Sequence, residues 1–346
     1  MNSDIINENL FGLDLFGDPI HQASYGVLSD KFLFPPFSVL DARNGKWQER
    51  KRAWISLGIQ SELGRDGART FGQDIMKGEW EGQTKHNYRQ EADRRSNINK
   101  ACKKPDWATG TGTENMAVGT SIFDPVLCEV LYNWFCPESG TIIDPFAGGS
   151  VRGIVASLLG RQYYGIDLSK SQIAANYEQS EKICNDYFPV WHNDDSVNIG
   201  DILDVVRVDF IFSCPPYYDL EVYSDDNRDL SNMSFNQFEE KYRAIIQHSV
   251  DMLKPNRFAC FVVGDIRDKA GYYRKLPNIT TDAFESAGAL LYNEALLITA
   301  VGSLPIRINR QFTAGRKLGK THQNILIFCK GDWRKAVKEL QHKDEY

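Results

Sequence analysis

The sequence predicts an α/β protein in which a mainly parallel β-sheet carries helices on both faces. From about residue 119 onward, short apolar runs that are typical of strands alternate with longer segments of helical periodicity. Several of these runs end in an acidic or glycine-containing turn, which is where ligands bind in sheets of this kind. The contents of hydrophobic (42%) and charged (25%) residues are ordinary for a globular protein.

Six strands are predicted in this region because each run is short and apolar. Their expected positions are 141–144, 163–166, 208–213, 258–263, 290–298 and 324–328. Apolar residues at helical spacing predict helices around and between them, at 123–135, 151–159, 169–184, 234–254 and 279–287. The longest helix begins with Ser234 and Gln237 in the arrangement of a capping box, and it ends before Pro255.

Length and composition exclude several classes of protein. The 346 residues allow one large domain or two smaller ones. With 40 Lys and Arg against 46 Asp and Glu, the formal charge of −6 excludes binding of nucleic acid by bulk positive charge, although a local basic surface remains compatible with it. No apolar run is long enough to span a bilayer, and the acidic N-terminus does not resemble a signal peptide. We therefore expect a cytoplasmic protein that makes no membrane contact.

The cysteines and histidines predict no metal site and no disulfide framework. The seven cysteines include no Cys-x-x-Cys pair, and the six histidines show no His-x-x-x-His spacing. Several cysteines lie in apolar runs, where a free thiol behaves as a small hydrophobic group.

The first strand ends in a turn with features of a ligand site. The turn consists of Asp144, Pro145, Phe146, Ala147 and Gly148. Glycine lets a backbone approach a ligand closely, and the start of the following helix offers free N–H groups. The spacing of Gly148, Gly149 and Gly153 does not match a dinucleotide fingerprint, so this turn alone does not identify a ligand.

Two further acidic residues follow later along the chain. Asp167, followed by Leu168, ends the next predicted strand, where a carboxylate can accept both hydroxyls of a ribose. Asp201, followed by Ile202, lies at a third turn, where a carboxylate or a neighbouring amide can contact an adenine edge.

The predicted strand 208–213 leads into a rigid corner. This corner consists of Ser213, Cys214, Pro215, Pro216 and Tyr217. The two prolines stiffen the backbone and remove two N–H donors, which leaves carbonyl acceptors beside an aromatic ring. Such a corner suits an exocyclic amino group on a planar base, and Tyr217 can stack on a base swung out of a duplex.

In this order, the motifs IIDPFAGGSVRG, YYGIDLS, IGD and FSCPPYY resemble those of the S-adenosylmethionine-dependent amino-methyltransferases of bacterial and phage DNA modification. The resemblance covers residues 119–330 and implies a Rossmann-like methyltransferase fold with a mostly parallel seven-stranded sheet. It implies S-adenosylmethionine as cofactor, with the turn 144–148 around the methionine part, Asp167 and Leu168 at the ribose, and Asp201 and Ile202 near the adenine. Phe123 lies in a segment similar to the family's flanking cofactor motif.

The resemblance implies transfer of a methyl group to cytosine N4 or adenine N6. The family places Asp, Asn or Ser before Pro-Pro, whereas this chain has Cys214 there. The carbonyls of Cys214 and Pro215, or the hydroxyl of Ser213, are candidate replacements for the missing acceptor. Three alternatives remain: C5 methylation of cytosine with Cys214 as nucleophile, methylation of RNA, and a nucleic-acid-binding relative without activity.

A basic region lies near the C-terminus. No acidic residue occurs from 295 to 331, and this segment is expected to contact DNA phosphates. The expected phosphate contacts are Arg307, Arg310, Arg316, Lys317 and Lys320. Recognition of base sequence is expected from residues 1–118 or from the loops 266–280 and 302–323. The acidic segment 218–233 is expected to form a lid, with Tyr218, Leu220 and Tyr223 as base contacts.

The expected organisation has three parts: an N-terminal region (1–118) with a polar and basic segment, a methyltransferase domain (119–331) and a C-terminal tail (332–346). The expected partner is double-stranded DNA, bound by a monomer or a homodimer. A cognate restriction nuclease is a further partner that the resemblance implies.

Overall fold

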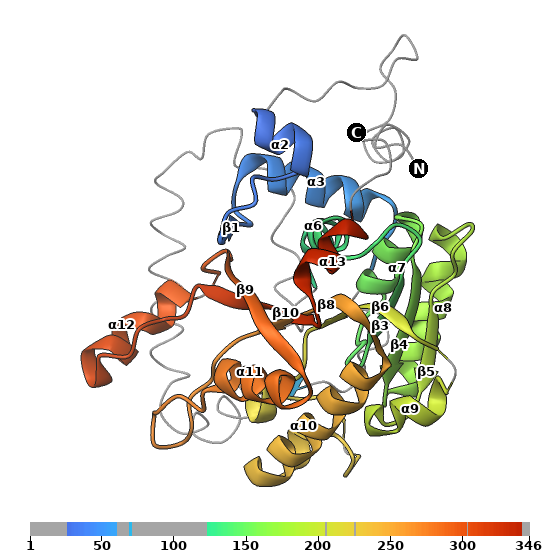
Figure 1. Cartoon of the computed structure of the whole chain (residues 1–346). Coiled ribbons are helices and arrows are strands. Elements are labelled where there is room, and N and C mark those ends of the chain that lie inside the picture. Colours follow the sequence, from blue (N-terminus) through green and yellow to red (C-terminus); the bar gives the residue numbers. More distant parts are fainter. Residues whose placement is uncertain are drawn as a thin grey trace.

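The computed structural model describes residues 26–60, 69–70, 123–204, 206–224, 226–302 and 304–340 (Figure 1). The strands of its main sheet are β1 (Val39–Asp41), β3 (Thr141–Asp144), β4 (Gln162–Asp167), β5 (Val190–Asn193), β6 (Val208–Ser213), β8 (Leu253–Val263), β9 (Ala289–Ile298) and β10 (His322–Lys330). Their order is β1-β9-β10-β8-β6-β3-β4-β5. β10 is antiparallel to both of its neighbours, and the other pairs are parallel. The mostly parallel sheet is confirmed, but it has eight described strands instead of seven.

The helices predicted at 123–135, 151–159, 169–184, 234–254 and 279–287 are present, and the structure has further helices that the pattern did not predict. The described helices are α2 (Val27–Phe32), α3 (Gly45–Ser56), α6 (Pro125–Phe135), α7 (Val151–Leu158), α8 (Lys170–Ile183), α9 (Ile199–Ile202), α10 (Phe235–Met252), α11 (Leu276–Ser286), α12 (Leu304–Gly315) and α13 (Trp333–Lys338). α10 begins with the expected capping box between Ser234 and Gln237. A small second sheet pairs β2 (Arg69–Thr70) with β7 (Glu221–Val222). No described helix is both long and apolar enough to cross a membrane.

The strands bury both of their faces, because successive side chains point to opposite sides of a sheet. Ile142, Phe210 and Phe212 belong to one core, and Ile143 and Ile211 belong to the other. The first core is covered by α3, α6, α7, α8 and α13, and the second by α9, α10 and α11. Helices on both faces of the sheet are therefore confirmed.

Residues N-terminal to position 119 contribute to the same sheet. β1 pairs in parallel with β9, with Val39 opposite Leu296. α3 packs on α6 and buries Trp47 and Trp54. The sheet is therefore not confined to residues 119–331. At the other end of the chain, α13 contacts β8 and buries Ala336.

The strand order places a ligand-binding crevice at the boundary between β3 and β6. From β3 the chain proceeds outward through β4 to β5, whereas β6 and β8 lie on the other side of β3. Helices that follow neighbouring strands in opposite directions leave a crevice at the carboxyl ends of those strands. Asp144 ends β3 and Ser213 ends β6, so both motifs predicted to be functional reach this crevice.

Candidate active site

A cavity of about 800 Å³ opens at the carboxyl ends of β3, β4, β6 and β8. Small-molecule sites have volumes of roughly 300–1,000 Å³. One wall consists of Phe123, Asp124, Pro145, Phe146, Gly148, Gly149, Asp167 and Leu168. The facing elements contribute Cys214, Pro215, Pro216, Tyr217, Gly264, Asp265, Lys320, His322 and Gln323. The structure thus brings most of the predicted cofactor residues and the diproline corner to one cavity.

Asp144 lies behind the glycine turn and does not line the cavity. Its side chain is fully buried, with Oδ1 accepting from the backbone N–H of Phe146 (3.1 Å) and Oδ2 accepting from the Tyr163 hydroxyl (2.7 Å). Arg152 Nε also donates to Oδ2, and its Nη2 donates to the carbonyl of Ala147 at 2.8 Å. Burial lowers the pKa of Arg152, but Asp144, Tyr163 and Cys214 together outweigh burial and the net shift is upward. Asp144 therefore shapes the turn through Arg152, and the fully buried Ala147 is likewise behind the ligand surface.

Gly148 and Asp167 together form a surface that fits a nucleoside. Gly148 has φ +50°, a left-handed conformation that glycine adopts readily, and its N–H donates to Asp167 Oδ2 at 2.9 Å. The N–H of Ser169 donates to Oδ1 of Asp167 at 2.8 Å. Burial raises the pKa of Asp167, although these two N–H groups oppose the shift. Each oxygen has a second lone pair, so the carboxylate can still accept both hydroxyls of a ribose.

The third acidic residue at this edge is Asp195, and the expectation for Asp201 is not met. Asp201 and Ile202 lie on α9, and neither lines the cavity. β5 carries the chain back to the crevice instead, and Asp195 and Ser196 line the cavity two and three residues after β5 ends. Oδ2 of Asp195 accepts from Lys241 Nζ at close range. The acidic pair at 194 and 195 was the signal for this position, but β5 is only four residues long and its pattern did not predict a strand.

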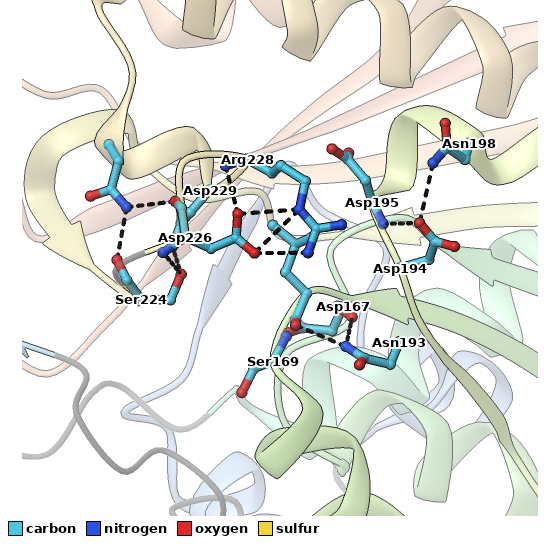
Figure 2. Close-up of polar contacts among 12 residues, drawn as sticks. Asp167, Ser169, Asn193, Asp194, Asp195, Asn198, Ser224, Asp226, Arg228 and Asp229 are labelled. Atoms are coloured by element: carbon cyan, nitrogen blue, oxygen red, sulfur yellow. Dashed lines mark hydrogen bonds and ion pairs between the residues drawn. The ribbon is translucent and has the colours of Figure 1, made fainter.

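The segment after the diproline corner is held by its own hydrogen bonds beside Asp195. Arg228 donates to both carboxylate oxygens of Asp226, and Ser224 Oγ donates to Asp229 Oδ2 at 2.9 Å. The hydrogen bond from Arg228 lowers the pKa of Asp226 to about 2. Figure 2 shows the Arg228 guanidinium between Asp226 and the turn that carries Asp195. Arg228 also lines the cavity, as Asp167 and Asp195 do.

Three aromatic and aliphatic residues of this segment were expected to contact a base. Leu220 and Tyr223 line the cavity. Tyr218 instead packs edge-on against Phe235, with ring centroids 5.3 Å apart, and lies under the guanidinium of Arg274. Tyr218 is therefore a packing residue in this structure.

In the diproline corner, the side chains of Ser213 and Cys214 occupy different environments. Ser213 is fully buried and its hydroxyl donates to Asp144 Oδ1 at 2.5 Å, so it does not line the cavity. Cys214 does line the cavity, and its Sγ lies 3.6 Å from the Tyr217 hydroxyl. Of the two candidate replacements for the family's acceptor, the Ser213 hydroxyl is thus committed elsewhere. The carbonyls of Cys214 and Pro215 remain.

Tyr217 is fixed on two sides. Its hydroxyl accepts from Gln323 Nε2 at 2.9 Å. Its ring packs against Gly264, where an added Cβ would lie 3.2 Å from Tyr217 Cε2. Burial raises the pKa of Tyr217 well above its ordinary value, so the hydroxyl is neutral at physiological pH. The sequence did not indicate the roles of Gly264 and Gln323, because both reach Tyr217 only through the folding of β8 and β10.

The predicted phosphate contacts fall into two groups. Arg310, Arg316 and Lys317 are exposed on α12 and the residues after it, in the segment that was expected to be a loop. α12 lies far from the other labelled helices in Figure 1. Lys320 instead lines the cavity, where burial lowers its pKa against the opposing charge of Asp265. The side chain of Arg307 lies outside the described residues.

No protein-family model matches the chain, and no curated protein sequence matches it. The solved structures that are similar include TrmN from Thermus thermophilus, with 13% identity and a TM-score of 0.40 over 60% of this chain and 49% of TrmN. A methyltransferase from Pyrococcus furiosus has 16% identity and a TM-score of 0.40 over 70% of this chain and 99% of its own. Magnesium protoporphyrin IX methyltransferase from Synechocystis, solved with bound S-adenosylmethionine, has 12% identity and a TM-score of 0.39 over 60% and 79%. The chain thus aligns with about half of TrmN.

Proposed function

We propose that the chain is an S-adenosylmethionine-dependent methyltransferase that methylates an exocyclic amino group, cytosine N4 or adenine N6, of a base in DNA. The observation that carries the proposal is that one cavity joins the Gly148–Asp167 surface to the Cys214–Tyr217 corner. A nucleoside-linked donor on the first surface faces an acceptor on the second. The resemblance of the motifs supports the same chemistry.

The residues of the cavity fit the proposed cofactor. Asp167 holds the ribose hydroxyls, and the backbone of Gly148 and Gly149 lies close to the ligand because neither carries a side chain. Asp195 and Leu230 lie at the side assigned to the adenine. When bound, the cofactor supplies an electrophilic methyl group on a sulfonium.

The diproline corner positions the acceptor nitrogen. An exocyclic amino nitrogen is a poor nucleophile because its lone pair is delocalised into the base. Carbonyl oxygens of Cys214 and Pro215 accept hydrogen bonds from the two amino hydrogens, which favours a pyramidal nitrogen. Gln323 and Gly264 hold the neutral Tyr217 ring in place for stacking on the base.

Access to a base inside a duplex requires that the base leaves the stack. The exposed basic residues of α12 and the residues after it are suited to phosphate contacts, which position DNA without reading its sequence. The partly buried location of Lys320 in the cavity suits contact with the extruded base itself. Two basic positions thus act on two different parts of the same DNA.

Transfer of a labelled methyl group tests the proposal. The full chain is incubated with S-adenosylmethionine carrying a radioactive methyl group and with duplex DNA, single-stranded DNA or RNA of matched sequence. The proposal expects label in DNA. Label in RNA alone would contradict the proposed substrate, and cofactor binding without transfer to any of the three would favour a binding protein.

A second candidate is C5 methylation of cytosine, which is favoured by one observation: the Cys214 thiol lines the cavity. In that reaction Sγ attacks C6 of the pyrimidine and C5 then attacks the methyl donor. Loss of the C5 proton and elimination of the thiolate complete the reaction. A covalent adduct with DNA containing 5-fluorocytosine distinguishes this route, since amino methylation forms no adduct.

A further inference from the structure

The N-terminal part of the chain supplies a charged pair to the cavity wall. Lys51 of α3 and Asp124, the residue before α6, both line the cavity. Lys51 Nζ lies 3.0 Å from Asp124 Oδ2, and the two side chains keep 29% and 13% of their exposure. The pair is therefore partly buried and still accessible from the cavity.

The position of Lys51 is fixed by its neighbours on α3. Arg50 Nε donates to Glu129 Oε2 at 2.5 Å, and Trp54 Nε1 donates to the same oxygen at 2.8 Å. Arg50, Trp54 and Glu129 have no more than 3% exposure, so this contact is a buried link between α3 and α6. Because Lys51 directly follows Arg50, its backbone is held against α6.

Asp124 is fixed beside the glycine turn. Its Oδ1 caps α6 by accepting from the backbone N–H of Val126 at 3.0 Å. The ring of the adjacent Phe123 lies under the Arg152 guanidinium, and the distance from Arg152 Cζ to the ring centroid is 4.6 Å. Arg152 also donates to the carbonyl of Phe146 in the turn. Phe123 and Asp124 thus lie next to the residues assigned to the donor.

The other charged residues lining this part of the cavity have partners or assigned roles. Lys241 donates to Asp195, Arg228 donates to Asp226, and Arg152 donates to Asp144. Asp167 is assigned to the ribose. An ammonium has three donors and a carboxylate has about four acceptor sites, so the Lys51–Asp124 contact leaves hydrogen-bonding capacity on both groups.

We infer that Lys51 binds the α-carboxylate and Asp124 binds the α-ammonium of the amino-acid part of the cofactor. This inference rests on the proposed function and names the two residues that would bind the charged groups of the amino-acid part. With the ribose at Asp167 and the methyl group facing Cys214, the amino-acid arm extends along the wall formed by Phe123 and Asp124. Each charged end of the arm then meets the member of the pair with the opposite charge, and charge-assisted hydrogen bonds of this kind are the strong ones.

Calorimetric titration of three ligands into the full chain tests the inference. S-adenosylhomocysteine carries both charged groups, decarboxylated S-adenosylhomocysteine keeps only the amine, and 5′-methylthioadenosine has neither. Lys51→Met is expected to weaken the binding of S-adenosylhomocysteine by roughly tenfold or more. The affinity for the other two ligands should change less than twofold. Asp124→Asn retains a residue suited to capping a helix. It is expected to weaken the binding of both amine-bearing ligands but not the binding of methylthioadenosine.

Equal weakening of all three ligands would overturn the inference, because it would show that the pair only holds α3 against α6. Unchanged affinity for S-adenosylhomocysteine in both variants would also overturn it. Lys51→Arg keeps the positive charge and is expected to keep most of the affinity for S-adenosylhomocysteine. That result would show that the loss in Lys51→Met comes from the missing charge and not from a folding defect. Lys182→Met removes an exposed lysine paired with Glu178, and this matched control should change no affinity.

Failure of the inference differs from failure of the proposed function. If methylthioadenosine and S-adenosylhomocysteine bind the wild-type chain but neither variant distinguishes them, only the roles of Lys51 and Asp124 are wrong. If none of the three ligands binds the wild-type chain, the proposed cofactor site itself is contradicted.

Discussion

The hydroxyl of Ser213 donates a 2.5 Å hydrogen bond to Oδ1 of Asp144 across the boundary between β6 and β3. Both residues are fully buried. This bond joins the strand that leads into the glycine turn to the strand that leads into the diproline corner. The relative position of donor and acceptor surfaces therefore depends on a contact beneath the cavity floor.

Ser213→Ala is expected to lower kcat while leaving the affinity for S-adenosylhomocysteine nearly unchanged. The substitution removes one donor to a buried carboxylate, so we also expect the free energy of unfolding to fall by about 1–3 kcal/mol. Urea denaturation, steady-state kinetics and calorimetry measure the three quantities. Ser56→Ala, at an exposed helix end, is the control for loss of a hydroxyl. A kcat equal to that of the wild type would show that the bond does not position the corner.

Asp167→Ala is expected to weaken the binding of S-adenosylhomocysteine by roughly 10- to 100-fold, because two hydrogen bonds to a charged group are lost. Burial raises the pKa of Asp167, so protonation removes the acceptor at a higher pH than for an ordinary aspartate. Wild-type affinity should therefore fall as the pH decreases through this raised pKa, whereas the affinity of Asp167→Ala should lack that component. Calorimetry from neutral to acidic pH measures both effects, and identical pH profiles would refute the assignment.

Gly264→Ala is expected to lower kcat by displacing Tyr217, because the added Cβ lies 3.2 Å from the Tyr217 ring. Cofactor affinity should change little, since Gly264 lies on the base side of the cavity. Gly200→Ala is a matched control, because a Cβ at Gly200 meets no atom within 4 Å. If both variants kept full activity, a fixed Tyr217 ring would not be needed for the reaction.

Arg310→Ala and Lys320→Ala are expected to differ in the salt dependence of DNA binding. Loss of one phosphate contact reduces the slope of log K against log salt concentration by about 0.9. We expect this reduction for the exposed Arg310, whereas Lys320→Ala should keep the slope and raise KM for DNA, because Lys320 lies in the cavity. Binding isotherms at several salt concentrations provide the slopes. A reduced slope for Lys320→Ala would show that Lys320 contacts a DNA phosphate and would contradict its assignment to the base.

The residues around the cavity show which parts of the site the sequence could predict. Asp167, Gly148 and Tyr217 lie in short local motifs at strand ends, and such motifs can be read without the tertiary fold. Asp195 was missed because the four-residue β5 gives too weak a pattern, and the third acidic residue was placed at Asp201 instead.

Burial and long-range packing account for the remaining differences. The charge pattern could not separate Lys320 from Arg310, because the two differ in burial and not in sequence context. β1 is three residues long and joins the sheet only by pairing with β9, which follows it by about 250 residues. Lys51 reaches the cavity for a similar reason, since α3 docks on α6 through a buried ion pair with Glu129.

The most direct test of the central claim is the identity of the base that the full chain modifies. Duplex DNA is incubated with the chain and S-adenosylmethionine bearing a trideuterated methyl group, then digested to nucleosides and separated by chromatography with mass detection. The account predicts deuterated N4-methylcytosine or N6-methyladenine. Deuterated 5-methylcytosine, or unmodified DNA in the presence of demonstrated cofactor binding, would contradict it.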